Sequence, residues 1–90
     1  RNIRSLTKNQ AYTLENRLAG FILLSTSTNL YQEKHTHTAD YLGVSYRHLL
    51  YVIAQFVKKG FLQKENRSYQ ISNRQALLEL AHVIEPDLFL

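Results

Sequence analysis

The residues best suited to chemistry lie on one side of a helix that we predict over residues 45–59. At 100° per residue, Arg47, Tyr51, Ala54 and Lys58 fall in a single row along this helix. A guanidinium can donate two hydrogen bonds to the O6/N7 edge of guanine, and a lysine ammonium can neutralise a phosphate. The row therefore indicates a surface that hydrogen-bonds to an anionic partner.

The positive charge of the chain is concentrated around this predicted helix. The formal net charge is +4, and residues 41–75 contain six Lys and Arg residues against the single acid Glu65. Residues 76–90 contain three acids and neither Lys nor Arg. A local basic field favours a nucleic acid, since each neutralised phosphate releases condensed counterions. A solvated basic surface would give the same charge distribution, and the helix pattern is what favours the nucleic-acid interpretation.

Other kinds of chemistry find little support in the sequence. His35, His37, His48 and Asp40 lie close together, but an i, i+2 pair does not share a helix face and zinc would need a further ligand or a water. These histidines are better interpreted as residues at a helix start or facing phosphate. Cysteine, a glycine-rich phosphate loop, a nucleophile elbow and carboxylates at catalytic spacing are all absent. We therefore predict a protein that is not an enzyme and that uses no cofactor or metal.

The composition indicates one small soluble domain. The chain has 90 residues, of which 44% are hydrophobic. No run reaches the ~18 apolar residues of a membrane span, and no signal-peptide pattern is present. The lack of cysteine suits a reducing compartment, so we expect a cytoplasmic protein that does not contact membranes. Because there is no initiator Met, we expect the chain to be part of a longer protein.

The helix over residues 45–59 also needs a face that holds it to the domain. Its apolar residues occur at i, i+3, i+4, i+7 and i+8, which places them on one stripe: Leu49, Val52, Ile53, Phe56 and Val57. Ser45 can cap the first turn, and Gly60 can adopt the left-handed conformation that ends the helix. Residues 36–42 are long enough for two helical turns before Gly43. Two helices joined by a short turn containing glycine indicate a helix-turn-helix.

A wing follows this motif. Residues 61–64 and 68–71 favour short strands on either side of Glu65-Asn66-Arg67, where Asn can supply a tight turn. The predicted fold class is therefore mainly α with a small β-hairpin wing, a winged helix-turn-helix.

The remaining elements complete this domain. We predict a helix over residues 13–26 that begins at Thr13, a short strand over residues 30–33, and a helix over residues 73–83 that begins at a capping box of Ser72 and Gln75. Leu77, Leu80, Ala81 and Ile84 are expected to point inward. Residues 1–11 have the pattern of the last turns of a longer helix.

The run Ala39–Leu49, followed by Lys59-Gly60-Phe61-Leu62, resembles the helix-turn-helix and first wing strand of the Crp/Fnr transcription regulators. The likeness continues in order from about Leu14 to Ala81. It implies a sequence-specific, double-stranded DNA-binding domain whose recognition helix, residues 45–59, enters the major groove. It also implies three regions: the end of a dimerisation helix and a linker over 1–12, the DNA-binding domain over 13–84, and a C-terminal tail over 85–90.

The resemblance assigns roles to individual residues. Base reading falls to Tyr46, Arg47, Leu50 and Tyr51. Family members commonly have Glu at the place of Arg47 and Arg at the place of Tyr51, so their usual operator cannot be transferred to this chain. Contacts to the DNA backbone are predicted for the residues at the helix ends and the wing tip: His35, Thr36, Ser45, His48, Gln55, Lys58 and Arg67.

The family also implies partners besides double-stranded DNA, namely a second copy of the full-length protein and RNA polymerase. An alternative function is a winged-helix protein-interaction module without specific DNA binding. In that case Leu50, Tyr51 and Ala54 would contact an apolar protein surface. Salt separates the two, because DNA binding weakens steeply with salt and an apolar contact does not.

Overall fold

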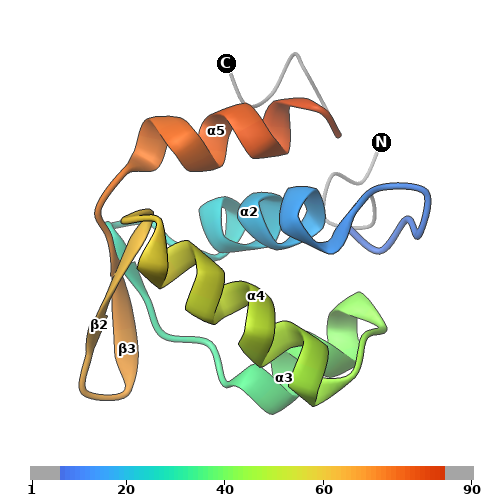
Figure 1. Cartoon of the computed structure of the whole chain (residues 1–90), viewed down its shortest axis with the longest axis horizontal. Helices are drawn as coiled ribbons and strands as arrows, with labels where there is room; N and C mark the ends of the chain where they lie inside the picture. The colour runs from blue at the N-terminus through green and yellow to red at the C-terminus, as the bar shows by residue number, and fades with distance from the viewer. Residues whose placement is uncertain (1–6, 85–90) are drawn as a thin grey trace.

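Helix α2 (Leu14–Ser25) lies at the centre of the computed structural model, which describes residues 7–84. Helix α5 (Arg74–His82) packs along one side of α2, and α3 (His35–Leu42) and α4 (Tyr46–Lys58) lie on the other side (Figure 1). A small sheet lies at one end of these helices (Figure 1). The order and types of these elements confirm the predicted winged helix-turn-helix.

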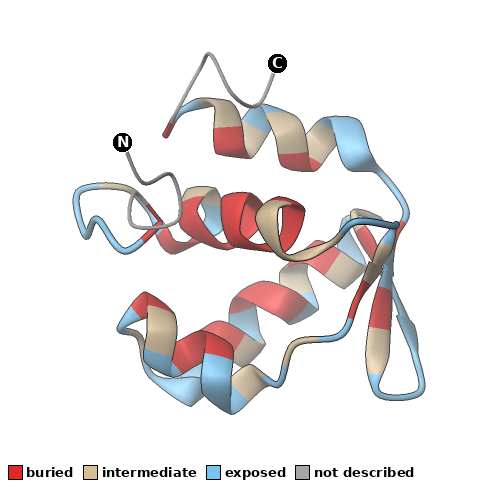
Figure 2. Cartoon of the chain, turned by 180° about the vertical axis from the view of Figure 1, so that it is seen from behind, coloured by how far each residue is buried: buried red, intermediate tan, exposed pale blue. Residues whose placement is uncertain are grey.

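The position of α2 between two layers explains its burial. Every residue from Arg17 to Leu23 is buried, so α2 is enclosed all round over this stretch. Figure 2 shows α2 mainly in red, with the buried residues of α5 and α4 turned toward it. The core contains side chains from all the helices and strands, among them Leu18, Ile22, Tyr31, Leu42, Leu49, Phe56, Leu62 and Leu77. Such apolar burial is the main force that stabilises a domain of this size.

The wing is wider than the predicted hairpin. Strands β2 (Leu62–Glu65) and β3 (Ser68–Ile71) pair antiparallel around a turn in which Asn66 has φ 51°. Asn tolerates this left-handed conformation better than most residues, which agrees with its predicted turn role. Strand β1 (Leu30–Tyr31) pairs antiparallel with β3, so the order in the sheet is β1-β3-β2. The chain segment before the helix-turn-helix is thereby held to the wing.

Local signals set most of the helix ends. The hydroxyls of Thr13 and Ser45 accept hydrogen bonds from the first turns of α2 and α4, as predicted. Gly60 has φ 81° and follows α4 in the left-handed conformation. The predicted capping box at Ser72 is wrong, because Asn73 caps α5 by accepting from the amide of Ala76. The amides of residues 72 and 73 both donate to the carbonyl of Phe61, which keeps the chain extended one residue further than expected.

The residues before α2 differ from the prediction as well. Residues 7–12 form turns rather than the last turns of a helix. The side chain of Asn9 accepts from the amide of Ala11 at 2.9 Å, and the amide of Tyr12 donates to the carbonyl of Asn9 at 3.1 Å. These bonds replace helical ones, as Asn side chains often do. The predicted helix at residues 1–6 and tail at residues 85–90 lie outside the described residues.

The inward residues predicted for the last helix are mostly confirmed. Leu77, Ala81 and Ile84 are buried, and Leu80 is half-buried. Within residues 7–84, none of the helices combines the length and the apolar character that crossing a bilayer would require.

Candidate nucleic-acid interface

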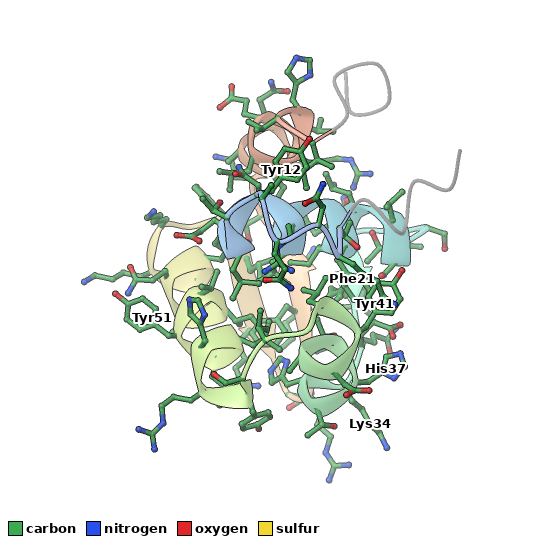
Figure 3. All side chains as sticks on the ribbon, turned by 90° about the vertical axis from the view of Figure 1, so that its right-hand side faces the viewer. Tyr12, Phe21, Lys34, His37, Tyr41 and Tyr51 are labelled. Atoms are coloured by element: carbon green, nitrogen blue, oxygen red, sulfur yellow. The ribbon has the colours of Figure 1, made fainter. Side chains whose placement is uncertain are left out.

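Helix α4 has two sharply different faces. Leu49, Val52, Ile53 and Phe56 are buried against the core, and Phe56 is only 1% exposed. On the opposite side Tyr51 is 63% exposed, and Figure 3 shows its ring pointing outward from α4. The predicted apolar stripe is therefore the face that fixes the rotation of α4, and its polar row is free to meet a ligand.

The turn before α4 is held by backbone hydrogen bonds. Gly43 has φ 71°, a left-handed conformation that suits glycine, and its amide donates to the carbonyl of Asp40 at 3.2 Å. The amide of Val44 donates to the carbonyl of Ala39 at 3.0 Å. The hydroxyl of Ser45 accepts from the amide of His48 at 3.0 Å. These bonds set the angle at which α4 leaves α3.

A buried arginine supports the same turn from inside the protein. Arg17 is 3% exposed, and its Nη1 donates to the carbonyl of Leu42 at 2.7 Å and to the carbonyl of Thr7 at 3.3 Å. Its Nη2 donates to Oε1 of Gln10 at 3.4 Å. Burial lowers the pKa of this guanidinium, although Arg keeps its charge in proteins. Arg17 thus ties α2 and the segment before it to the last residue of α3.

A role for Arg17 in supporting α4 was not predicted from the sequence. A signal for it existed, since position 17 follows Leu14 by three residues and precedes Phe21 by four. That spacing places Arg17 on the apolar side of α2, where a charged residue requires a specific partner. The identity of the partner, a backbone carbonyl 25 residues later, could not be read from spacing.

The four predicted base-reading residues lie on the accessible side of α4. Tyr46 is 49% exposed, Arg47 and Tyr51 are exposed, and Leu50 is half-buried. Tyr46 and Arg47 are in the first turn, and Leu50 and Tyr51 follow in the next. Long side chains with this accessibility, on one side of a helix, can contact base edges in a groove.

The residues predicted to contact the DNA backbone surround this row. Five of them are exposed: Thr36, Ser45, His48, Lys58 and Arg67. Gln55 is half-buried beside the row. Lys58 lies in the last turn of α4, and Arg67 lies at the tip of the wing after Asn66. Basic and hydrogen-bonding groups therefore lie at both ends of α4 and at the tip of the wing.

His35 has a partner within the protein. Its Nε2 lies 3.1 Å from the hydroxyl of Tyr69 in β3, and the centroids of the two rings are 5.5 Å apart. Burial, and secondarily the charge of Lys64, lowers the pKa of His35. The ammonium of Lys64 also lies over the ring of Tyr69, 4.9 Å from its centroid. His35 therefore connects the start of α3 to the wing. Its predicted contact with the DNA backbone would have to form while the bond to Tyr69 is kept.

The histidines do not gather into a metal centre. Among residues 7–84, no three His, Cys, Asp or Glu side chains are arranged so that they could hold a metal ion. His37 points outward from α3 (Figure 3), and His48 is exposed on α4.

The amino-acid sequence is closely similar to one bacterial regulator. It is 59% identical over 87 residues to the regulatory protein YeiL of Escherichia coli O157:H7. The match includes 97% of this chain and 40% of YeiL, so the chain spans less than half the length of that relative. No protein-family model matches the sequence.

Solved structures add the fold. A protein described as a Crp/Fnr-family transcriptional regulator from Eubacterium rectale has a TM-score of 0.76 and 24% identity, over 81% of this chain and 35% of its own. A second Crp/Fnr-family transcriptional regulator, from Thermus thermophilus, has a TM-score of 0.76 and 20% identity, over 88% of this chain and 45% of its own. The chain is a relative of YeiL with the fold of the Crp/Fnr regulators.

The likeness to YeiL includes nearly all of the helix-turn-helix and wing described above, because it covers 97% of the chain. The likeness to the two solved structures is one of fold. Because their sequence identity is low, the exposed residues of α4 are interpreted from their own chemistry. The resemblance seen in the sequence at Ala39–Leu49 is thereby confirmed as a likeness to YeiL in sequence and to the Crp/Fnr regulators in fold.

Proposed function

We propose that the chain is the sequence-specific, double-stranded DNA-binding domain of a bacterial transcription regulator of the Crp/Fnr type. The observation that carries this proposal is the division of α4 into a buried apolar face and an exposed row that begins with Arg47 and ends with Lys58. The major groove admits an α-helix, and its base edges differ in their donors and acceptors. The exposed row of α4 offers the side chains for reading them.

Within this proposal the residues divide by the part of DNA that they meet. Tyr46, Arg47, Leu50 and Tyr51 face base edges, because they lie in the first two turns of α4. The surrounding residues meet phosphates: Thr36, Ser45, His48, Gln55, Lys58 and Arg67, with His35 joining them while it keeps its bond to Tyr69. Phosphate contacts position a protein on DNA, and base contacts give it sequence preference.

The full-length protein is proposed to act in the cytoplasm as a homodimer that contacts RNA polymerase, without enzymatic activity. Residues 1–12 would then link the dimerisation helix to the DNA-binding domain at 13–84, with a tail at 85–90. The resemblance to Crp/Fnr regulators supports this arrangement. Two linked helix-turn-helix domains would read half-sites about 34–36 Å apart, and their linkage would raise the effective concentration of the second reader.

Selection of bound sequences from a random duplex pool tests the proposal. We expect a short consensus to emerge, and the selected duplex to bind more tightly than a scrambled duplex of the same composition. Binding should weaken steeply as salt rises, because the basic residues around α4 release counterions from phosphates. A pool that remains random after repeated selection would contradict sequence-specific binding.

A second candidate function is a winged-helix module that binds another protein. The observation in its favour is the exposure of two large aromatic rings, Tyr46 at 49% and Tyr51 at 63%. Solvent-exposed aromatic residues are enriched where proteins meet. A complex of this kind would tolerate salt, so the salt series that accompanies the selection also distinguishes the two functions.

A further inference from the structure

The outward face of α4 combines one guanidinium with a group of apolar surfaces. Beyond Arg47 the exposed row continues with Tyr51 and Ala54, and Leu50 is half-buried at its edge. Helix α4 contains no Asp or Glu. Carboxylates are the side chains that accept from the amino group of cytosine, so the face lacks the group best suited to that base.

One base pair presents an apolar group in the major groove. Thymine carries a C5-methyl there, and apolar side chains recognise it by contact. Tyr51 is the most exposed aromatic residue of α4 at 63%, its ring points outward (Figure 3), and the half-buried Leu50 lies next to it in the chain. The outward face of α4 is otherwise suited to an anion. Among the four bases, thymine is therefore the one that its apolar side chains can contact best.

Charge favours DNA over a protein as the occupant of this face. Arg47 and Lys58 lie at either end of the apolar group, and residues 41–75 contain six Lys and Arg residues against one acid. The apolar side chains of α4 therefore have a cation on either side. The matching surface is one in which apolar groups lie between phosphates. Thymine methyls in the major groove meet that description.

Helix geometry indicates where the thymine lies. Leu50 and Tyr51 follow Arg47 by three and four residues, which on a helix corresponds to about 4.5–6 Å along its axis. Successive bases on one strand are about 3.4 Å apart along the duplex. The apolar group therefore lies within about two base pairs of the base that Arg47 contacts.

We propose that Leu50 and Tyr51 recognise thymine by its 5-methyl group, next to a guanine that Arg47 reads. This inference rests on the proposed function and names the bases that the same site selects. Each half-site should then contain a thymine within about two base pairs of that guanine.

Replacement of thymine by deoxyuridine in the selected duplex tests this inference. The replacement removes one methyl group and leaves the Watson–Crick hydrogen bonds unchanged. At one or two positions near the guanine we expect binding to weaken about fourfold, as the loss of one buried methyl predicts. Deoxyuridine elsewhere in the half-site should have no effect.

Three variants assign the effect to the side chain. The Tyr51→Ala protein should bind the thymine duplex and the duplex with deoxyuridine at one of these positions equally tightly. The Tyr51→Phe protein should still bind the thymine duplex more tightly, because it retains the ring. Arg47→Ala should lose preference for guanine and still distinguish thymine from deoxyuridine. Tyr51 is exposed, so these substitutions should leave the melting temperature unchanged.

The outcomes separate this inference from the proposed function. Equal binding of the thymine and deoxyuridine duplexes, both tighter than a scrambled duplex, would overturn methyl recognition and leave sequence-specific binding in place. Loss of discrimination in Tyr51→Phe would overturn it too, by assigning the contact to the hydroxyl. If the selected and scrambled duplexes bind equally, the proposed function fails and methyl recognition fails with it.

Discussion

The protein interior and the outward face of α4 each contain an arginine, Arg17 and Arg47, and the two guanidinium groups differ in their partners. Arg17 is 3% exposed, and its guanidinium donates to two backbone carbonyls and one side-chain amide. Arg47 is exposed in the first turn of α4. In the interior the protein itself supplies the acceptors. On the outward face the donors stay available to a ligand.

The difference has a physical origin in solvation. A buried cation loses its hydration and is tolerated only where other polar groups replace the water. For Arg17 the replacement includes the carbonyl of Leu42 at the end of α3, so stabilising the charge also holds the turn before α4. Arg47 stays hydrated until a partner arrives. The first arginine therefore contributes to the shape of the site and the second to its chemistry.

The largest effect should come from removing the apolar contact that holds α4 in place. Phe56 is 1% exposed in the core, so Phe56→Ala should lower the free energy of unfolding by about 3–5 kcal/mol. Tyr51→Ala, on the outward face of the same helix, should change it by at most about 0.5 kcal/mol. Urea denaturation of both variants measures the difference, and similar losses would mean that the two faces are wrongly assigned.

The next effect tests the buried arginine. Arg17→Met has a similar length but leaves the carbonyl of Leu42 without its charged donor, which should cost about 1–3 kcal/mol of stability. Arg47→Met is the matched substitution on the outward face, and it should be nearly neutral for stability. Thermal denaturation of the two proteins compares them directly. A neutral Arg17→Met would show that the carbonyl is satisfied without Arg17, for example by Nε2 of Gln10, which also donates to it at 3.4 Å.

The exposed arginine should matter for binding instead. We expect Arg47→Ala to cost about 1–3 kcal/mol on the selected duplex and to relax the preference at one base pair, with little loss on scrambled DNA. Fluorescence anisotropy with both duplexes provides the measurement. Equal losses on the two duplexes would assign Arg47 to a phosphate, and base reading would then rest on Tyr46 and Tyr51.

A smaller and less specific effect is expected at the ends of the outward face. Lys58→Ala and Arg67→Ala should each weaken binding to selected and scrambled duplexes alike, because both residues are predicted to meet phosphates. Each substitution should also lower the slope of log affinity against log salt by about one. A change in base preference for either variant would contradict its assignment to the backbone.

The smallest effect on stability is expected at the hydrogen bond between His35 of α3 and Tyr69 of the wing. Burial lowers the pKa of His35 below its ordinary value of 6.5, so the unfolded chain binds a proton at this position more readily than the folded one. Stability should therefore be fully present above pH 6.5 and decline as the pH falls below it. His35→Gln should reduce this decline, and His37→Gln, at an exposed position, should not. Denaturation curves at several pH values test the pair.

Much of α4 was predictable because its determinants are local. The period of Leu49, Val52, Ile53 and Phe56 defines which side of α4 is buried, and the same period places Arg47 and Tyr51 on the other side. The cap at Ser45 and the left-handed Gly60 likewise depend on atoms within one turn. That those residues read bases stays a prediction.

Packing decided the features that local patterns misjudged. Two neighbouring residues could have capped α5, and the hydrogen bonds of residues 72 and 73 to Phe61 selected Asn73. Residues 7–11 had a helical pattern, but the side chain of Asn9 forms a turn there instead. In both places the side chain of Ser or Asn offers the backbone an alternative hydrogen bond, and a bond specific to this structure selects between the alternatives.

Contacts between residues far apart in the chain came from the tertiary structure alone. Arg17 donates to the carbonyl of Leu42, 25 residues away, and His35 bonds to Tyr69, 34 residues away. The sequence by itself determined the presence of α2 to α5, the turn of the wing and the two faces of α4, because these depend on neighbours within a few residues. Only the fold decided which acceptors a buried charge would find and how the wing would be tied to α3, since a carbonyl or a ring becomes a partner only when packing brings it within bonding distance.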